Sequence, residues 1–278
     1  MTRIIADTTA CLPPSIQEQY DIPVVPQLIH FGEKSFIEGV DINTDTFLEI
    51  LQSAPELPKT SAPPPELFSA IFERYSQDDQ TIVCIHPSTD LSGTVRSAET
   101  ARLDFLDLDI RILDTRLVAS PLGTVVHQAA QWAEQGLDPD DLCQKVADFA
   151  QRGKIFFLVA SLDYLARGGR IGGASALLGN ALQIKPILTL TDGRVEPFAK
   201  ERTFKKALSS LKTLVIEEYP KNAPGHMTIM HAGSHELADD LADYFAHELS
   251  IPKPPSSYLP PAIITHAGPG SIAVGFFS

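Results

Sequence analysis

The sequence predicts an α/β protein of two domains, and three observations support this fold class. The chain has 278 residues and is 44% apolar, which is enough to bury more than one core. Short apolar runs alternate with helical patterns in the first half, a βαβα order typical of a doubly wound parallel sheet. The dipeptide Asp192-Gly193 in the second half predicts a tight antiparallel hairpin. We therefore expect an N-terminal domain of residues 1–153 with a parallel sheet and a C-terminal domain of residues 154–278 with a mixed sheet.

Helix starts in the first half are indicated by prolines and by Asn43. Proline suits the first helical position, and an asparagine side chain can accept a hydrogen bond from the first turn. The expected strands are 3–6, 24–31, 81–86 and 109–113. The expected helices are 13–20, 43–51, 65–75, 95–103, 121–134 and 139–152.

The second half contains more strand than helix. Two amphipathic patterns with helical spacing interrupt a series of short apolar runs, and a proline-rich loop is expected over 251–261. The expected strands are 154–160, 186–191, 194–200, 227–231 and 262–265, and a final apolar run covers 272–277. The expected helices are 203–219 and 234–249.

The charge of the chain excludes some partners and suggests others. A net charge of −13 argues against non-specific binding to nucleic acid or to an anionic membrane. The window Arg152–Lys206 is the exception, since its ten Lys/Arg and four Asp/Glu give a net charge of about +6. This window is either a basic face that balances acidic neighbours or a surface that docks an anion or a partner.

Cysteine use and hydropathy point to a cytoplasmic protein. The three cysteines are widely spaced and odd in number, which suggests neither a disulfide framework nor a thiolate metal site. No apolar run approaches the roughly 18 residues needed to span a bilayer, and the N-terminus does not resemble a signal peptide.

The most informative motif is Leu91-Ser92-Gly93-Thr94, between an expected strand and an expected helix. Unpaired N–H groups and the helix dipole favour anions at such a helix start. Hydroxyls of Ser92 and Thr94 add donors, and Gly93 permits close approach of the backbone. Taken alone, the motif is weak evidence for an anion site, because most Ser/Thr turns before helices are ordinary N-caps.

Two further loops are rich in small or hydroxyl residues. Thr60-Ser61-Ala62-Pro63-Pro64-Pro65 enters an expected helix, although its three prolines also suit a stiff linker. The segment Thr265–Gly270 carries His266 at the end of an expected strand, where a structural histidine is the simpler interpretation.

Several common catalytic motifs do not occur in the chain. The glycine-rich stretch 167–173 fits neither the dinucleotide-binding spacing nor the P-loop. No serine lies in a G-x-S-x-G elbow, and the histidines show no pair with metal-ligand spacing on one helix. We expect no metal and no nucleotide cofactor.

Taken together, the motifs resemble the DegV family in type and order along nearly the whole chain. Those that carry the resemblance are Asp7-Thr8-Thr9-Ala10, Gly39-Val40-Asp41-Ile42, Thr60-Ser61, Leu91-Ser92-Gly93-Thr94, Leu162-Asp163-Tyr164-Leu165, Gly168-Gly169-Arg170-Ile171, Ile184-Lys185-Pro186-Ile187-Leu188 and Thr265-His266-Ala267-Gly268-Pro269-Gly270. Two positions depart from the family pattern: Pro64 stands where serine is frequent, and Asp90 where glycine is frequent.

The resemblance implies a two-domain protein that encloses one long-chain fatty acid between its domains. Similar proteins act as the acyl-binding subunit of bacterial fatty acid kinase and serve phospholipid metabolism. A separate kinase subunit supplies ATP and phosphorylates the bound carboxylate. The implied partners are thus the fatty acid and the kinase subunit, with no nucleic acid and at most transient membrane contact.

The resemblance also implies roles for seven residues. The expected ligands of the carboxylate are Thr60, Ser61, Ser92, Gly93 and His266, and the expected contacts of an acyl phosphate or the kinase are Arg170 and Arg202. The chain would then be a lipid-binding protein without catalytic residues of its own. Two alternatives remain open: a lipid carrier with no kinase partner, and a hydrolase or phosphotransferase that uses Ser92 and His266.

Overall fold

The computed structural model describes residues 2–76, 80–178, 184–221 and 223–278, and the chain divides into two compact units. Unit 1 consists of Met1–Ile42 and Thr60–Gln151, and unit 2 of Asn43–Lys59 and Arg152–Ser278. One parallel sheet and one mixed sheet, both packed with helices, confirm the predicted fold class. Within the described ranges, no helix is both long enough and apolar enough to cross a membrane.

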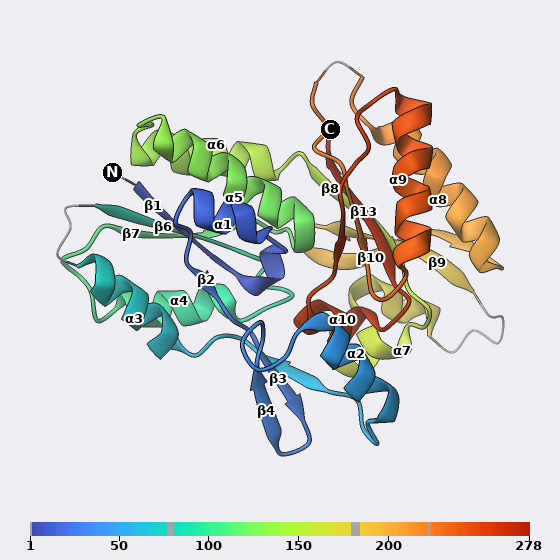
Figure 1. The fold of residues 1–278 in the computed structure, drawn as a ribbon, viewed down its shortest axis with the longest axis horizontal. Coiled ribbons are helices and arrows are strands. Elements are labelled where there is room, and N and C mark those ends of the chain that lie inside the picture. Colours follow the sequence, from blue (N-terminus) through green and yellow to red (C-terminus); the bar gives the residue numbers. More distant parts are fainter. Residues whose placement is uncertain (1, 77–79, 179–183, 222) are drawn as a thin grey trace. The chain divides into compact units, whose positions relative to one another are not determined.

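A four-stranded parallel sheet forms the centre of unit 1. The elements are β1 (Thr2–Asp7), η1 (Thr8–Ala10), α1 (Pro14–Gln19), β2 (Val24–Val25), β3 (Leu28–Phe31), β4 (Lys34–Ile37), β5 (Lys59–Ser61), α3 (Pro65–Tyr75), β6 (Thr81–His86), α4 (Thr94–Arg102), β7 (Ile110–Asp114), α5 (Ala119–Glu134) and α6 (Pro139–Ala150). The sheet order is β2-β1-β6-β7, and β4-β3-β5 form a small second sheet. Figure 1 shows α3 and α4 on one side of the parallel sheet and α5 and α6 on the other.

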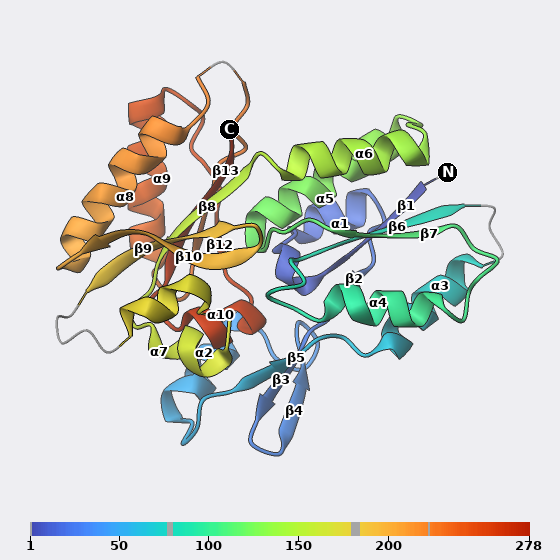
Figure 2. The same ribbon diagram turned by 180° about the vertical axis from the view of Figure 1, so that it is seen from behind.

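Unit 2 is built on a six-stranded mixed sheet of order β10-β9-β8-β13-β11-β12. The elements are α2 (Thr44–Ser53), β8 (Gly153–Leu158), α7 (Asp163–Gly168), η2 (Gly172–Leu177), β9 (Lys185–Thr191), β10 (Arg194–Glu201), α8 (Phe204–Glu218), β11 (Thr228–His231), α9 (His235–Leu249), β12 (Ser256–Tyr258), α10 (Pro261–Ala267) and β13 (Ile272–Phe277). Apolar residues of α8 and α9 pack on the sheet, and α10 contacts both α7 and α2 (Figure 2).

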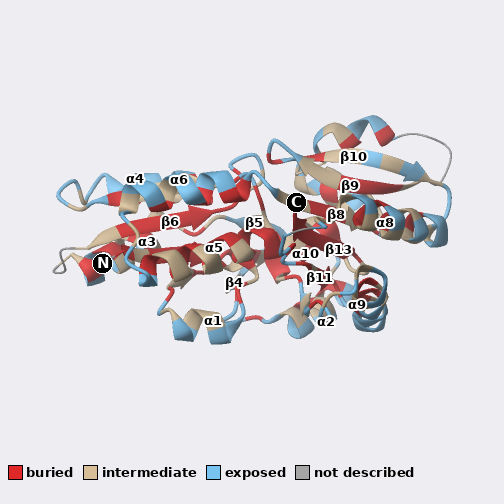
Figure 3. Cartoon of the chain, turned by 90° about the horizontal axis from the view of Figure 1, so that it is seen from above, coloured by how far each residue is buried: buried red, intermediate tan, exposed pale blue. Residues whose placement is uncertain are grey.

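Strands and helices both contribute to each core. In unit 1, β6 is buried at every position except Thr81, and in unit 2 β13 is buried along its full length (Figure 3). Phe68 and Phe72 of α3 are fully buried in the unit 1 cluster, where Ile5 and Ile82 of the sheet also lie. Burial of this kind contributes about 1.5–3 kcal/mol for each large apolar side chain.

Local signals set many of the element boundaries as predicted. Asn43 accepts a hydrogen bond from Thr46 N at 2.9 Å and caps α2. Helix α3 occupies the expected span 65–75, and β6 the expected span 81–86. Positive φ angles at Asp192 (48°) and Gly193 (78°) confirm the predicted tight turn between β9 and β10.

Three expected elements were wrong. Residues 262–265, expected as a strand, lie in helix α10, because Pro260 and Pro261 start a helix there and lack the N–H groups of a sheet ladder. The expected strand 24–31 is split into β2 and β3, which belong to different sheets. The proline-rich loop contains β12, which pairs in parallel with β11.

The compact units also differ from the expected domains 1–153 and 154–278 in the segment 43–59. This segment packs with unit 2, where Thr44 Oγ1 donates a hydrogen bond to Leu259 O at 3.2 Å. Its sequence carries an ordinary capped amphipathic helix, and such a local pattern does not encode which core the helix covers.

Candidate functional site

The start of α4 carries the motif that the sequence analysis singled out. Gly93 is the N-cap residue and has no side chain to cap the helix, so Ser92 supplies the local acceptor. Thr94 N donates to Ser92 Oγ at 3.3 Å, and the hydroxyls of Ser92 and Thr94 are 2.8 Å apart. The first turn of α4 contains no acidic residue. Neutral donors and the helix dipole therefore make this turn suited to an anion.

Thr60 and Ser61, expected in a loop, lie in strand β5 of unit 1. A Cβ on Gly93 would stand 3.4 Å from the Cβ of Ala62, which directly follows β5, so the end of this strand lies beside the start of α4. Thr60 is half-buried and Ser61 is exposed. The Ser61 hydroxyl is hydrogen-bonded to His30 Nε2 at 2.8 Å. The Ser61 hydroxyl can therefore donate to a ligand only when His30 Nε2 is the donor in this bond.

The carboxylate of Asp90 is paired with a cation. Arg116 Nη2 lies 2.9 Å from Asp90 Oδ2, and Arg116 also contacts Asp114. An acidic side chain two residues before Ser92 would repel an anionic ligand, but the guanidinium offsets its charge. The departure of Asp90 from the family pattern thus leaves the turn compatible with an anion.

A buried polar network extends from this turn into the core of unit 1. Asp7 and His86 are both fully buried, and His86 Nδ1 lies 2.9 Å from Asp7 Oδ2. Gln27 Nε2 donates to Asp7 Oδ1 at 3.1 Å and to Thr94 Oγ1 at 2.9 Å. The network connects the ends of β1 and β6 to the helix start that carries Ser92.

Sequence reasoning missed Gln27 and His86 as parts of this site. One signal was available, since Asp7 and His86 end adjacent strands of a parallel sheet, and such ends gather at one edge. Gln27 carried no comparable signal, because it lies in an irregular segment between two short strands.

In unit 2 the structure brings His266 and Arg170 together. His266 lies in α10, and a Cβ on Gly168 would stand 2.2 Å from its Nδ1 atom. Arg170 follows α7, and its Nη1 donates to Gly168 O at 2.6 Å. Burial and, to a lesser extent, the charge of Arg170 lower the pKa of His266 to about 3. Burial also lowers the pKa of Arg170. The pair therefore consists of a neutral imidazole and a desolvated cation at neutral pH.

Arg202 is exposed in the turn between β10 and α8. Lys205 and Lys206 are exposed in the first turn of α8, which has no acidic residue, and Lys200 precedes them. The N-terminus of a helix already carries the positive end of its dipole, so these cations do not stabilise α8. Together with Arg202 they make this part of the basic window a positive surface segment of unit 2.

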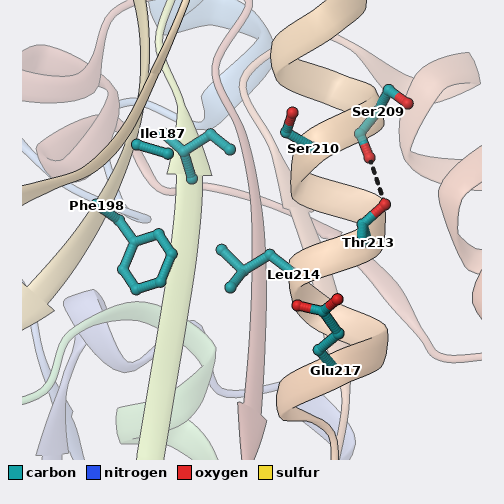
Figure 4. Close-up of a pocket in the computed structure, with 8 residues that line it drawn as sticks. Ile187, Phe198, Ser209, Ser210, Thr213, Leu214 and Glu217 are labelled. Carbon is teal, nitrogen blue, oxygen red and sulfur yellow. Dashed lines mark hydrogen bonds between the residues drawn. The ribbon is translucent and has the colours of Figure 1, made fainter.

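An open pocket of about 300 Å³ lies elsewhere in unit 2, between the strands β9 and β10 and helix α8 (Figure 4). It contains none of the predicted site residues. Its lining residues are Ile187, Phe198, Ala199, Ser209, Ser210, Thr213, Leu214 and Glu217.

The predicted site residues thus fall into three groups. The hydroxyl residues Thr60, Ser61 and Ser92 and the backbone of Gly93 gather in unit 1, whereas His266 and Arg170 form a pair in unit 2. Arg202 lies on the surface of unit 2. Ser92 Oγ is bonded to the hydroxyl and amide of Thr94, and neither group is a general base.

Cysteine chemistry contributes little to these sites. All three cysteines are free, and burial raises the pKa of Cys11 and Cys84, which disfavours the reactive thiolate. Across the described ranges, no group of three or more His, Cys, Asp or Glu side chains is arranged to hold a metal ion.

Comparison with known sequences identifies relatives along the whole chain. A family model described as "Uncharacterised protein, DegV family" matches residues 1–278. A DegV domain-containing protein of Halalkalibacterium halodurans is 34% identical over 280 residues, covering 99% of this chain and 97% of the relative. Protein DegV of Bacillus subtilis is 29% identical and covers 98% of this chain and 97% of its own length.

Solved structures show the same fold. A DegV family protein of Thermus thermophilus, described for its fatty acid binding, matches with a TM-score of 0.91 and 27% identity over 100% of this chain and 99% of its own. DegV of Bacillus subtilis, described as a fatty acid binding protein, matches with a TM-score of 0.90 and 29% identity over 100% and 99% of the two chains.

Proposed function

Because the chain belongs to the DegV family, we propose that it binds one long-chain fatty acid and needs no cofactor to do so. The observation that carries this proposal is the full-length likeness to two solved DegV family proteins described as fatty-acid-binding. The donor set at the start of α4 supports it independently, since neutral hydroxyls and a helix start suit a carboxylate.

The energetics of a fatty acid fit such a site. Burial of a sixteen-carbon tail supplies on the order of 12 kcal/mol of gross transfer free energy at about 0.8 kcal/mol per methylene. Loss of ligand freedom offsets much of it. A carboxylate without hydrogen bonds would cost several kcal/mol more on burial. The tail therefore explains affinity, and the hydroxyl donors explain orientation.

We assign the carboxylate to Thr60 and Ser92, with Ser61 and the Gly93 backbone beside them. Ala62, which directly follows Thr60 and Ser61 of β5, lies beside Gly93 at the start of α4, and this proximity supports the assignment. His266 is proposed to act on the same head group, as the family resemblance implies.

Mass spectrometry of an organic extract from the purified protein tests the binding proposal. We expect one fatty acid per chain. Protein that carries no lipid, takes up none from added hexadecanoate and hydrolyses ester substrates would support the hydrolase alternative and contradict the proposal.

We further propose that the bound fatty acid is presented to a separate kinase subunit, which forms the acyl phosphate. An acyl phosphate carries more negative charge than a carboxylate, so Arg170 and Arg202 would favour product over substrate. The exposed cations around Arg202 would also steer an acidic partner surface, in a manner that salt weakens.

Charge reversal at Arg202 tests the kinase proposal more cleanly than reversal at Arg170, which is half-buried beside His266. R202E should slow association with the kinase subunit and reduce its salt dependence, while fatty acid binding stays unchanged. K34E makes the same charge change at an exposed position of β4 and is the matched control. Equal association rates for R202E and K34E would contradict the docking role.

His266 has a separate test in the same assay. H266A should retain bound lipid but lose phosphorylation, because the histidine would balance charge during phosphoryl transfer. Wild-type phosphorylation by H266A would leave His266 a structural residue.

A further inference from the structure

We propose that Gln27 and Thr94 are positioning residues that orient the Ser92 hydroxyl, so that its proton is available only to a ligand. Three consecutive hydrogen bonds carry this inference, from Asp7 through Gln27 and Thr94 to Ser92. It rests on the proposed function, because it takes Ser92 as a ligand of the fatty acid carboxylate.

The first step is the orientation of the Gln27 amide. Asp7 Oδ1 accepts hydrogen bonds from Thr9 N at 3.0 Å and from Thr9 Oγ1 at 2.6 Å. A carboxylate oxygen offers only acceptor sites, so the Gln27 group 3.1 Å from it must be the NH₂ end. Asp7 is fully buried and Gln27 is 3% exposed, which leaves little solvent to compete for these bonds.

The second step is the direction of the Thr94 hydroxyl. The remaining N–H of Gln27 is donated to Thr94 Oγ1 at 2.9 Å, so Thr94 accepts on that side. Thr94 is fully buried, and Ser92 Oγ stands 2.8 Å from its hydroxyl as an acceptor. Donation from Thr94 to Ser92 satisfies the buried Thr94 proton without solvent.

The third step concerns Ser92 itself. Its oxygen accepts from the Thr94 hydroxyl at 2.8 Å and from Thr94 N at 3.3 Å. A serine hydroxyl has two acceptor lone pairs and one donor. With both lone pairs occupied, its only free function is to donate. Ser92 is half-buried, so this proton can be directed outward to a ligand.

A hydroxyl restricted to donation selects the head group of the lipid. A carboxylate only accepts hydrogen bonds and gains a charge-assisted bond from such a donor. A fatty alcohol forms a weaker neutral bond. The chain of hydrogen bonds from Asp7 through Gln27 and Thr94 to Ser92, here called the relay, therefore favours the ionised acid over the neutral alcohol of the same chain length.

The test compares hexadecanoate and hexadecanol binding by T94V, T94S and S92A. T94V removes the hydroxyl at nearly constant shape and frees the Ser92 proton to turn. We expect T94V to weaken hexadecanoate about tenfold while hexadecanol changes much less, because a charge-assisted bond is lost. T94S keeps the hydroxyl and should bind both ligands like the wild type. T94V added to S92A should cause no further loss if Thr94 acts through Ser92.

The outcomes distinguish a failure of the relay from a failure of the carboxylate assignment. If S92A weakens hexadecanoate and T94V does not, the relay is wrong and the carboxylate site stands. If T94V weakens both lipids equally, Thr94 is only structural and the relay is again wrong. If S92A itself binds hexadecanoate like the wild type, the carboxylate assignment fails, and the relay fails with it.

A second variant guards against misfolding of T94V, since valine leaves a Gln27 N–H without its acceptor. Q27M removes the amide and leaves the hydroxyls of Thr94 and Ser92 in place. The relay predicts the same loss of preference for acid over alcohol in Q27M, and an unchanged preference in folded Q27M would overturn it.

Discussion

The hydroxyl turn of unit 1 (Ser92–Thr94) and the His266–Arg170 pair of unit 2 both contain buried polar groups, but these groups are stabilised in opposite ways. In unit 1, the polar atoms from Asp7 to Ser92 are joined by hydrogen bonds, and the donors that face outward are neutral. In unit 2, an imidazole and a guanidinium are placed together under burial, and the pKa values of both groups fall.

Because the two regions bury their polar groups differently, they should differ in the free energy lost on burial and in their response to pH and to ligand charge. A network whose polar atoms are joined by hydrogen bonds loses little free energy on burial. A desolvated cation beside a histidine retains its charge only at a cost, so its surroundings respond to pH and to ligand charge. We therefore expect ligand orientation to depend on unit 1 and acid sensitivity to depend on unit 2.

The largest expected effect is on the hydroxyl turn. The double variant T60A/S92A removes two bonds to the carboxylate, each worth about 1.5–3 kcal/mol, so affinity for hexadecanoate should fall by about two to four orders of magnitude. Titration of the delipidated protein measures this loss. T100A removes a hydroxyl from the second turn of α4 and is the matched control. Undiminished affinity in a folded T60A/S92A protein would place the carboxylate elsewhere.

The next effect tests how tightly the unit 2 pair is packed. G168A places a Cβ 2.2 Å from His266 Nδ1, so the ring must move, and we expect a stability loss of about 1–3 kcal/mol in urea unfolding. G93A in unit 1 places its Cβ at 3.4 Å from the nearest side chain. It should cost less than about 1 kcal/mol, the price of a poorer N-cap. Equal losses would remove this contrast between the two regions.

Acid sensitivity should follow His266. Its pKa is about 3 in the folded protein and 6.5 as the unperturbed value, so the unfolded chain binds the proton first as pH falls. The part of the stability that depends on a neutral His266 ring is complete above pH 6.5 and is lost as pH falls toward 3. The slope is at most about 1.4 kcal/mol per pH unit. Unfolding of wild type and H266Q at pH 7 and pH 5 should differ by about 1–2 kcal/mol in their pH response. A parallel pH response in both proteins would show that another group carries the sensitivity.

The smallest effect concerns Asp90, the acidic residue beside the hydroxyl turn whose charge Arg116 offsets. R116A leaves Asp90 without the partner that lies at 2.9 Å, so an anionic ligand should bind up to about fivefold more weakly at low salt. The double variant R116A/D90N removes both charges and should restore binding. If R116A binds hexadecanoate normally at low ionic strength, the charge of Asp90 is already screened by solvent.

Much of the fold was predictable because its signals are local. Prolines and caps marked the starts of α2, α3 and α6, and Asp192-Gly193 marked the hairpin of unit 2. Residues 262–265 have strand-like side chains, but the preceding prolines and the surrounding helices α7 and α2 favour a helix there.

The candidate site was predictable only in part. Ser92 and Thr94 stand at a recognisable strand-to-helix turn, and the resemblance to the DegV family supplied the remaining expected residues. The relay from Asp7 was not predictable, because Gln27 and Thr94 are 67 positions apart. Hydrogen bonds over such separations depend on the order of strands in the sheet.

The sequence by itself determined where most helices and strands begin and end, which loops carry hydroxyls and which segment is basic. Caps, turns and hydrophobic periods act over a few residues, so they can be read without the fold. Only the tertiary structure decided that residues 43–59 pack with unit 2, that Arg116 offsets Asp90 and that Gln27 reaches Thr94. Each of these depends on contacts between distant segments, which exist only once the sheets have formed.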